Sequence, residues 1–548
     1  MSARAIACAL SVLALSAGCS LVKLSEDIVI ERCDSHNDCA GLNDPEAASF
    51  PCEQWQCNGD SGRCELGPTD LDGDGQSPAT VDGVECDVPE DEADCDDDTD
   101  EVAIGAAEQC DGQDNDCDGQ VDEGVLGRGP VRRLVTFDNG ELGAATSASY
   151  ARDPNSGALA IAYGMDSQQA GLSVLDSPEA TASNDDLKVN GSATSAPTGE
   201  VVVTPLDGDA FAVAFVDGDG GAHLVAGLVE RGSDSATVEA DIAGGGLACI
   251  PDGDCGGPEA TRLALAGTGI DVALAYLETD AAPTCGAPDP DGDPVLRATA
   301  LFAVGGGLTA REGAPVELGP SADGAPAGLL AIGELGERRA RETGWLIAYV
   351  DAAGNLRVGH LQLDADNELV VGADALVTRD AAGGARGSPA LAFGPDTQEG
   401  RWLALTHRVD CGRDGRILLE LFLVELDDDG GLVLTEQASD IEVGGDAPGE
   451  RAPALAYSEV LDAWAVSYLD SRGLRARVLS RDGTLRGESP YELLRDEADD
   501  SLRTLLTPGL VPLGEEAWFG VLAHVQRQSE DVPRAFEMFT LGCDLPGR

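Results

Sequence analysis

Aspartate, glycine and cysteine are concentrated between residues 70 and 124 of this 548-residue chain. Three runs place aspartates at alternate positions, and two of these runs are followed directly by glycine. So many like charges close together cost free energy unless a hard cation neutralises them. A loop that curls around an ion turns every second side chain inward, and a glycine lets the next backbone carbonyl join the coordination shell. The pattern therefore predicts calcium ligation by Asp70, Asp72, Asp74, Asp96, Asp98, Asp100, Asp114, Asp116, Asp118 and Asp122.

Three resemblances rest on these runs. Asp70-Leu71-Asp72-Gly73-Asp74-Gly75 matches the opening of an EF-hand loop, although Val81 stands where that loop has its closing glutamate. Together the runs resemble thrombospondin type 3 repeats, which hold calcium with such aspartates and a disulfide. Residues 94–124 resemble the MopE-type metal-binding motif of secreted bacterial proteins, through Cys110-Asp111-Gly112, Asp114 to Gly119 and Asp122-Glu123. The resemblance to the MopE-type motif implies copper, because some members of that family are linked with this metal.

The donor chemistry separates the candidate metals. Copper prefers imidazole or sulfur ligands, whereas no histidine lies between residues 70 and 127 and the cysteines there are expected to be oxidised. Oxygen ligands alone favour calcium over copper. An acidic loop without an ion is the alternative for this module. Zinc is the alternative for the cysteines of residues 33–69, but no Cys-x-x-Cys knuckle is present.

The N-terminus predicts export and lipidation. A basic start at Arg4 is followed by an apolar stretch, which is too short to span a bilayer, and by small residues. Leu15-Ser16-Ala17-Gly18-Cys19 resembles the bacterial lipobox, with Ser16 where leucine is more common. This resemblance implies a signal peptide over residues 1–18, lipidation of Cys19 and, because Ser20 follows, the outer membrane. An ordinary cleaved signal is the alternative. Residues 19–32 would then form a lipidated tether.

Cysteine spacing predicts disulfides, because an exported chain meets an oxidising compartment. Without Cys8 and Cys19, nine cysteines lie between Cys33 and Cys117, and five lie further along the chain. Both groups are odd, so full pairing needs at least one bridge from the N-terminal group to the later one. Cys543 is the expected partner in that bridge, and two free thiols are the alternative. Residues 33–69 are too few to form a core, so their cysteines must staple them.

The acidic composition excludes some partners. The formal net charge is −66, with 100 acidic and 34 basic residues. Nucleic acid would be repelled, and an anionic membrane surface would not attract the folded part. Solubility in high salt is an alternative reason for this charge. A hydrophobic share of 43 % is normal for a folded chain.

One strand signature recurs from residue 131 onward at intervals of roughly 50 to 70 residues, the length of a four-stranded sheet with its loops. Its copies are Leu159–Tyr163, Phe211–Phe215, Val272–Tyr276, Trp345–Tyr349, Trp402–Thr406, Trp464–Tyr468 and Trp518–Leu522. Further strands precede and follow these copies. Seven radial sheets form a β-propeller, and residues 131–137 could complete the last blade and close the ring. Two β-sandwiches are the runner-up architecture.

The prediction is therefore a mainly β protein. A disulfide-rich module (33–69) and an acidic metal-binding module (70–127) precede a seven-bladed β-propeller (131–548).

No catalytic motif stands out in the repeats. Ser480-Arg481-Asp482-Gly483-Thr484 faintly resembles a sialidase Asp-box, but it occurs once and reads better as a turn. His407 and His524 follow equivalent strands and are expected at the surface. The predicted function is a non-catalytic, lipid-anchored, calcium-binding protein of the outer membrane or cell surface, whose propeller binds an extracellular or periplasmic ligand. The alternatives are an envelope hydrolase or lyase with its site in the propeller channel, and a copper scavenger.

Overall fold

The computed structural model divides into two compact units, Met1–Glu108 with Gln113–Gly119, and Gln109–Gly112 with Gln120–Arg548. No helix in the described part of the chain is long and apolar enough to cross a membrane. The structure describes residues 33, 39, 52–58, 61–72, 76–81, 84–86, 88–89, 93–136, 145–165, 169–177, 187–188, 197–217, 223–230, 237–239, 263–278, 295–311, 313, 315–320, 328–331, 344–351, 353, 355–372, 375–377, 385–398, 400–409, 415–426, 432–445, 453–495, 502–504, 508–513, 518–527 and 535–543.

Disulfides replace an apolar core in the first unit. Its hairpin pairs β1 (Glu53–Asn58) with β2 (Arg63–Pro68), and Cys57 and Cys64 of these strands form a buried cluster with Cys33 and Cys39. Short pairs follow, β3 (Ser77–Pro78) with β6 (Ala93–Asp94) and β4 (Thr80–Val81) with β5 (Val84–Glu85). The bridges in this unit are Cys33–Cys57, Cys39–Cys64, Cys52–Cys86 and Cys95–Cys117. Because these cysteines are oxidised, they are not zinc ligands. The N-terminal region is disulfide-rich, as predicted, and the Cys52–Cys86 bridge extends beyond the predicted 33–69 module.

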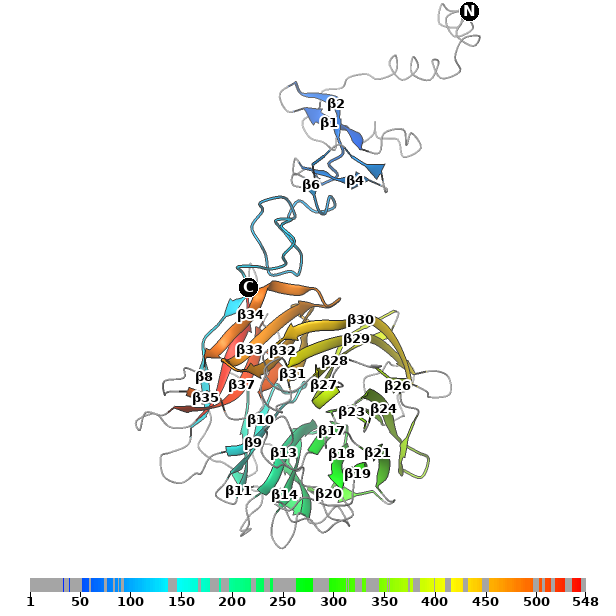
Figure 1. The fold of residues 1–548 in the computed structure, drawn as a ribbon, viewed down its shortest axis with the longest axis vertical. Helices are drawn as coiled ribbons and strands as arrows, with labels where there is room; N and C mark the ends of the chain where they lie inside the picture. The colour runs from blue at the N-terminus through cyan, green and yellow to red at the C-terminus, as the bar shows by residue number, and fades with distance from the viewer. Residues whose placement is uncertain are drawn as a thin grey trace, which may run out of the picture. The chain divides into compact units, whose positions relative to one another are not determined.

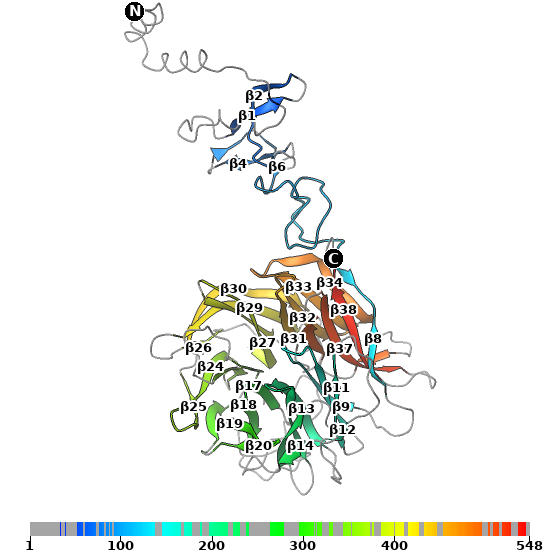
Figure 2. The same ribbon diagram turned by 180° about the vertical axis from the view of Figure 1, so that it is seen from behind.

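The described strands of the second unit form seven antiparallel sheets arranged around a common centre (Figures 1 and 2). The first three blades are β9 (Ala145–Arg152), β10 (Leu159–Met165), β11 (Gln169–Leu175) and β12 (Leu187–Lys188); β13 (Pro197–Leu206), β14 (Ala210–Asp217), β15 (His223–Glu230) and β16 (Thr237–Glu239); and β17 (Leu263–Thr268), β18 (Asp271–Glu278), β19 (Val295–Val304), β20 (Gly307–Ala310) and β21 (Val316–Pro320). The predicted seven-bladed propeller is confirmed.

Three further blades complete most of the ring. They are β22 (Gly328–Ala331), β23 (Gly344–Val350), β24 (Leu356–Leu363), β25 (Leu369–Val371) and β26 (Ala375–Leu376); β27 (Ala385–Thr397), β28 (Gly400–Val409), β29 (Arg416–Leu426) and β30 (Leu432–Gly444); and β31 (Ala454–Ser458), β32 (Ala463–Asp470), β33 (Gly473–Ser480) and β34 (Leu485–Arg495). In these six blades the first strand lies innermost, next to the innermost strands of the neighbouring blades.

The seventh blade combines both ends of the unit. It contains β35 (Leu502–Thr504), β36 (Gly509–Pro512), β37 (Trp518–Arg527) and β38 (Ala535–Gly542), and its outer strands are β7 (Gly127–Arg128) and β8 (Arg132–Thr136). Figure 2 shows β8 beside β38. The expectation that residues 131–137 would complete the last blade is thereby confirmed through the described residues 132–136. β36 also contacts β9, so the ring of inner strands is closed.

The recurring signature lies on the second strand from the centre of every blade, and that strand is covered by neighbouring blades on both faces. Alternate residues face opposite neighbours: Leu159, Ile161 and Tyr163 pack toward the seventh blade, while Ala160 and Ala162 pack toward the second. One apolar cluster fills each boundary between neighbouring blades among the described residues. In the first three blades and the sixth, large side chains face the preceding blade and alanines face the next, which permits close stacking.

Candidate metal sites and buried polar groups

The first unit brings three carboxylates together from two segments of the acidic module. Asp70 and Asp72 follow strand β2, and Asp97 lies just after β6. One carboxylate oxygen of each residue lies within 4.8 Å of the others. The backbone N–H of Leu71 donates a hydrogen bond to Oδ1 of Asp97 at 2.9 Å, which fixes the two segments in this register. Asp70 is almost fully buried, with 5 % of its surface exposed.

Burial and the neighbouring carboxylates affect the protonation of Asp97 in this cluster. The pKa of the Asp97 carboxyl is raised to about 6, first by burial and also by the negative charges of Asp94, Asp72 and Asp70, while the hydrogen bond from Leu71 opposes this rise. A carboxyl with this pKa is only partly ionised near pH 6. A hard cation placed among these oxygens would favour the ionised form of every one of them.

A second cluster lies in the loop between residues 113 and 119. The carboxylates of Asp114, Asp116 and Asp118 supply oxygens within 4.8 Å of one another. The N–H of Asp118 donates to Oδ1 of Asp114 at 3.1 Å, and the N–H of Gly119 donates to Oδ2 of Asp114 at 2.8 Å. Gly119 has φ +89°, and Cys117 has φ +60° and is bridged to Cys95. The predicted curl of alternate aspartates is therefore present in this run.

The remaining predicted ligands are placed differently. Asp96, Asp98 and Asp100 are exposed, and among the described residues they do not form such a cluster. Asp74 and Cys19 lie outside the described residues. Asp97 was not among the predicted ligands. Between residues 94 and 100, the alternate spacing of aspartates predicts the even-numbered residues as ligands. In the structure, the hydrogen bond from Leu71 instead places Asp97 in the cluster. That tertiary contact left no signal in the local spacing.

Asp122 belongs to a buried ion pair in the second unit. Its side chain is fully buried, and Oδ2 lies 2.9 Å from a guanidinium nitrogen of Arg486, which is 1 % exposed. Oδ1 of Asp122 accepts hydrogen bonds from the N–H groups of Asp111 and Gly112, each at 3.1 Å. Burial raises the pKa of the Asp122 carboxyl, while Arg486 and these two N–H groups lower it. Sequence reasoning did not single out Arg486, which no local motif marks.

Cys110 lies two residues before Gly112 and is bridged to Cys543. The expected bridge to Cys543 is therefore confirmed. Both cysteines belong to the second unit. The other cysteines of the later group, at positions 249, 255, 285 and 411, lie outside the described residues.

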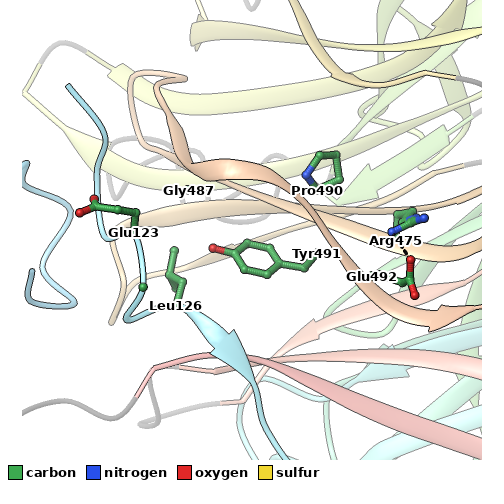
Figure 3. A pocket seen from close by; sticks show the side chains of 8 residues that line it. Glu123, Leu126, Arg475, Gly487, Pro490, Tyr491 and Glu492 are labelled. Carbon is green, nitrogen blue, oxygen red and sulfur yellow. Dashed lines mark ion pairs between the residues drawn. The ribbon is translucent and has the colours of Figure 1, made fainter. Parts of the chain in front are cut away.

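An open pocket of about 550 Å³ lies along strand β34 (Figure 3). Arg475 is paired there with Glu492 at 2.9 Å and with Asp470 at 3.1 Å. These pairs satisfy the guanidinium, so the lining has no excess of positive charge. Its residues are Glu123, Gly124, Leu126, Arg475, Gly487, Pro490, Tyr491 and Glu492.

His407 is buried, so the expectation that it would lie at the surface is wrong. The ring is fully enclosed, and Nε2 lies 3.0 Å from Oε1 of Glu420, which is 2 % exposed. Oε2 of Glu420 accepts the N–H of Asp440 at 3.0 Å, at an irregular point of strand β30. His407 follows Leu405 by two positions on β28, and Leu405 packs against the fourth blade. The side chain of His524 lies outside the described residues.

Two other sequence interpretations are confirmed. Ser480 to Thr484 form the turn between β33 and β34, in which Oδ1 of Asp482 accepts the N–H of Thr484 at 2.9 Å. Trp345 and Trp464 are fully buried between blades, and Trp402 at the matching position is half-buried.

The fold and these sites define a seven-bladed β-propeller that follows a disulfide-rich acidic unit. The chain matches no known protein family, and no curated protein resembles it in sequence. Solved structures of other proteins are similar to this chain at low sequence identity. A lectin from Burkholderia pseudomallei has a TM-score of 0.43 at 11 % identity and covers 72 % of this chain and 98 % of its own. The fucose-specific lectin from Aleuria aurantia has a TM-score of 0.36 at 13 % identity, with 64 % and 96 % covered.

The sialidase of Trypanosoma rangeli has a TM-score of 0.36 at 11 % identity. This match covers 76 % of the present chain but only 59 % of the sialidase.

Proposed function

We propose that this protein is a lipid-anchored, calcium-binding protein of the outer membrane or cell surface, with a propeller that binds a ligand outside the cytoplasm. The observation that carries the calcium proposal is the convergence of Asp70, Asp72 and Asp97 within 4.8 Å. These residues come from two separate segments, so a bound ion would join the segment after β2 to the segment after β6. Such a cross-link would stiffen a unit that has little apolar core.

Calcium fits the donors better than other metals. Calcium takes six to eight oxygen ligands in flexible geometry, so carboxylates, backbone carbonyls and water together can complete its shell. The first unit offers two carboxylate clusters, and residues 70–127 contain no histidine. Cys95 and Cys117 are joined in a disulfide and are not available as thiolate ligands for copper.

The proposed role of the propeller as a binding head rests on its construction. Rigid blades position loops whose sequences can vary, an arrangement suited to recognition. The buried His407–Glu420 pair is enclosed between blades and could not reach a substrate, because the two side chains are 0 % and 2 % exposed. We assign this pair to packing and not to acid–base catalysis.

Calorimetric titration of the full chain with calcium, and separately with copper, tests the metal proposal. We expect heat with calcium, and binding about 10- to 100-fold weaker in Asp70→Asn and Asp97→Asn. Glu53→Gln is the matched control, because it removes an exposed carboxylate of the same unit that lies in neither cluster. Absence of calcium binding, or copper binding tighter than calcium binding, would refute the proposal.

Lipidation is tested separately. Metabolic labelling with a fatty acid should mark the wild-type protein and leave Cys19→Ala unlabelled, with the variant released from the membrane fraction. Neighbouring Ser20→Ala is the control and should remain labelled. A wild-type protein without label would refute the anchor while leaving the calcium proposal standing.

A further inference from the structure

The buried ion pair of Asp122 and Arg486 holds the two ends of the loop that carries Asp114, Asp116 and Asp118. On the N-terminal side, the N–H groups of Asp111 and Gly112 donate to Oδ1 of Asp122, ten or eleven residues further along the chain. These bonds close the intervening segment into a ring through a side chain. The ring is closed by one carboxylate, and Arg486 is bound to the other oxygen of that carboxylate.

Arg486 is in turn fixed by the sixth blade. Its guanidinium donates to the backbone oxygen of Leu461 at 2.9 Å, and its Nε donates to the Ser480 hydroxyl at 3.0 Å. The neighbouring N–H of Gly487 donates to the backbone oxygen of Val121 at 3.1 Å, so residues 121 and 122 lie along the beginning of β34. The carboxylate that closes the ring is therefore anchored to a rigid sheet.

Gly112 shows how closely this arrangement is packed. Its φ is +82°, and a Cβ at this position would lie 2.2 Å from a guanidinium nitrogen of Arg486. Only glycine satisfies both conditions without displacing Arg486. The disulfide of Cys110 with Cys543 fixes the same stretch of chain two residues earlier.

We propose that Asp122 and Arg486 are a positioning pair for the cation loop, and that Asp122 acts through this pair and not as a metal ligand. The inference rests on the proposed calcium function of the Asp114–Asp118 cluster. A loop whose ends are already held loses less conformational freedom when an ion orders it, so the ion binds more tightly. Groups that orient metal ligands without touching the metal commonly change affinity in this way.

The test uses the full chain with Asp122→Ala/Arg486→Met, which removes both buried charges together and avoids leaving one unpaired. The matched control is Asp462→Asn/Arg481→Gln, which removes a half-exposed ion pair from the same blade. Hydrogen exchange of residues 113–119 is measured without metal, and calcium affinity is measured by calorimetry. In the positioning variant we expect exchange about tenfold faster and calcium binding about 10- to 100-fold weaker, with the control unchanged.

Four results decide the inference. Unchanged loop exchange in a variant whose propeller still melts cooperatively would overturn the positioning role. Faster exchange with unchanged calcium affinity would also overturn it, because the loop order would then not serve the ion. If the wild-type chain binds no calcium, the proposed function fails, and the metal-free exchange still decides whether the pair orders the loop. Gly112→Ala, whose Cβ would displace Arg486 and whose left-handed backbone is unfavourable for alanine, should also speed the exchange; normal exchange in it would count against the pair.

Discussion

Cys110 and Cys543 are joined by a disulfide that spans 433 residues of sequence. Cys543 directly follows β38, and Cys110 precedes the strands β7 and β8, which pair with β38 on its other edge. The bridge therefore links covalently the same two parts of the chain that the seventh blade joins by hydrogen bonds.

Removing this bridge should destabilise the propeller. We expect Cys110→Ser/Cys543→Ser to lower the free energy of unfolding by about 2–5 kcal/mol, because the unfolded chain regains the freedom that the cross-link removes. Thermal unfolding of the propeller transition measures the effect. Cys95→Ser/Cys117→Ser, which opens a bridge of the first unit, should leave that transition in place. An unchanged transition in the first variant would show that the hydrogen bonds alone hold the ring closed.

Strand β8 should contribute to stability through its apolar contacts. Leu134 is 2 % exposed and packs at the boundary between the seventh and first blades. Leu134→Ala should cost about 2–5 kcal/mol, as a buried leucine truncation does. Val131→Ala, three residues earlier and 52 % exposed, should cost less than about 0.5 kcal/mol. Chemical denaturation measures both losses of unfolding free energy. Equal losses in the two variants would argue against a contribution of β8 to closing the ring of blades.

The tryptophans at matching blade positions should differ in their contribution to the stability of the propeller. Trp464 is fully buried, contacts Tyr457 with ring centroids 4.7 Å apart, and donates its indole N–H to the backbone oxygen of Arg481 at 3.0 Å. Trp464→Ala should destabilise the propeller by about 3–5 kcal/mol. Trp402→Ala should cost clearly less, because Trp402 is only half-buried. Denaturant midpoints compare the two, and the reverse order would contradict the packing assignment.

Calcium affinity should depend on pH through Asp97. The pKa of this carboxyl is raised to about 6 in the folded chain, so the folded state holds the proton more tightly than the unfolded state. The associated stabilisation of the metal-free unit is present at low pH and is lost as pH rises through about 6. Calcium requires the ionised carboxylate, so affinity should increase about tenfold between pH 5 and pH 7.

Calorimetry at a series of pH values measures this dependence. Asp97→Asn should flatten the curve over that interval, whereas Glu53→Gln should keep the wild-type slope. If calcium affinity still rises steeply with pH in Asp97→Asn, a group other than Asp97 is responsible for the pH dependence.

The architecture of the propeller could be predicted from sequence because its strongest signal is repeated and local. The second strand of each blade is covered on both faces, so it is a continuous apolar run such as Trp345–Tyr349, and the run recurs in every blade. The environment of His407 could not be predicted in the same way. Its partner Glu420 lies on the next strand, and nothing in the intervening residues indicates that their side chains meet.

The candidate sites were predictable only where the spacing itself forms the cluster. Asp114, Asp116 and Asp118 converge within one tight loop, so alternation was sufficient. Asp97 joins Asp70 and Asp72 through a contact between distant segments, and Asp122 is paired with an arginine in the sixth blade. Neither contact can be read from the local spacing of the carboxylates. The alternate spacing alone therefore could not show that Asp97 joins a cluster or that Asp122 is paired with an arginine.

The pairing of β8 with β38 has a consequence for how the protein is made. Arg133 on β8 meets Glu537 on β38, which follows it by 404 residues, at 3.2 Å. Synthesis proceeds from the N-terminus, so β8 is made early and has no partner strand until the last part of the chain is synthesised. The seventh blade is therefore the last to be completed, and a truncated or stalled chain would expose an unpaired strand at each side of the gap.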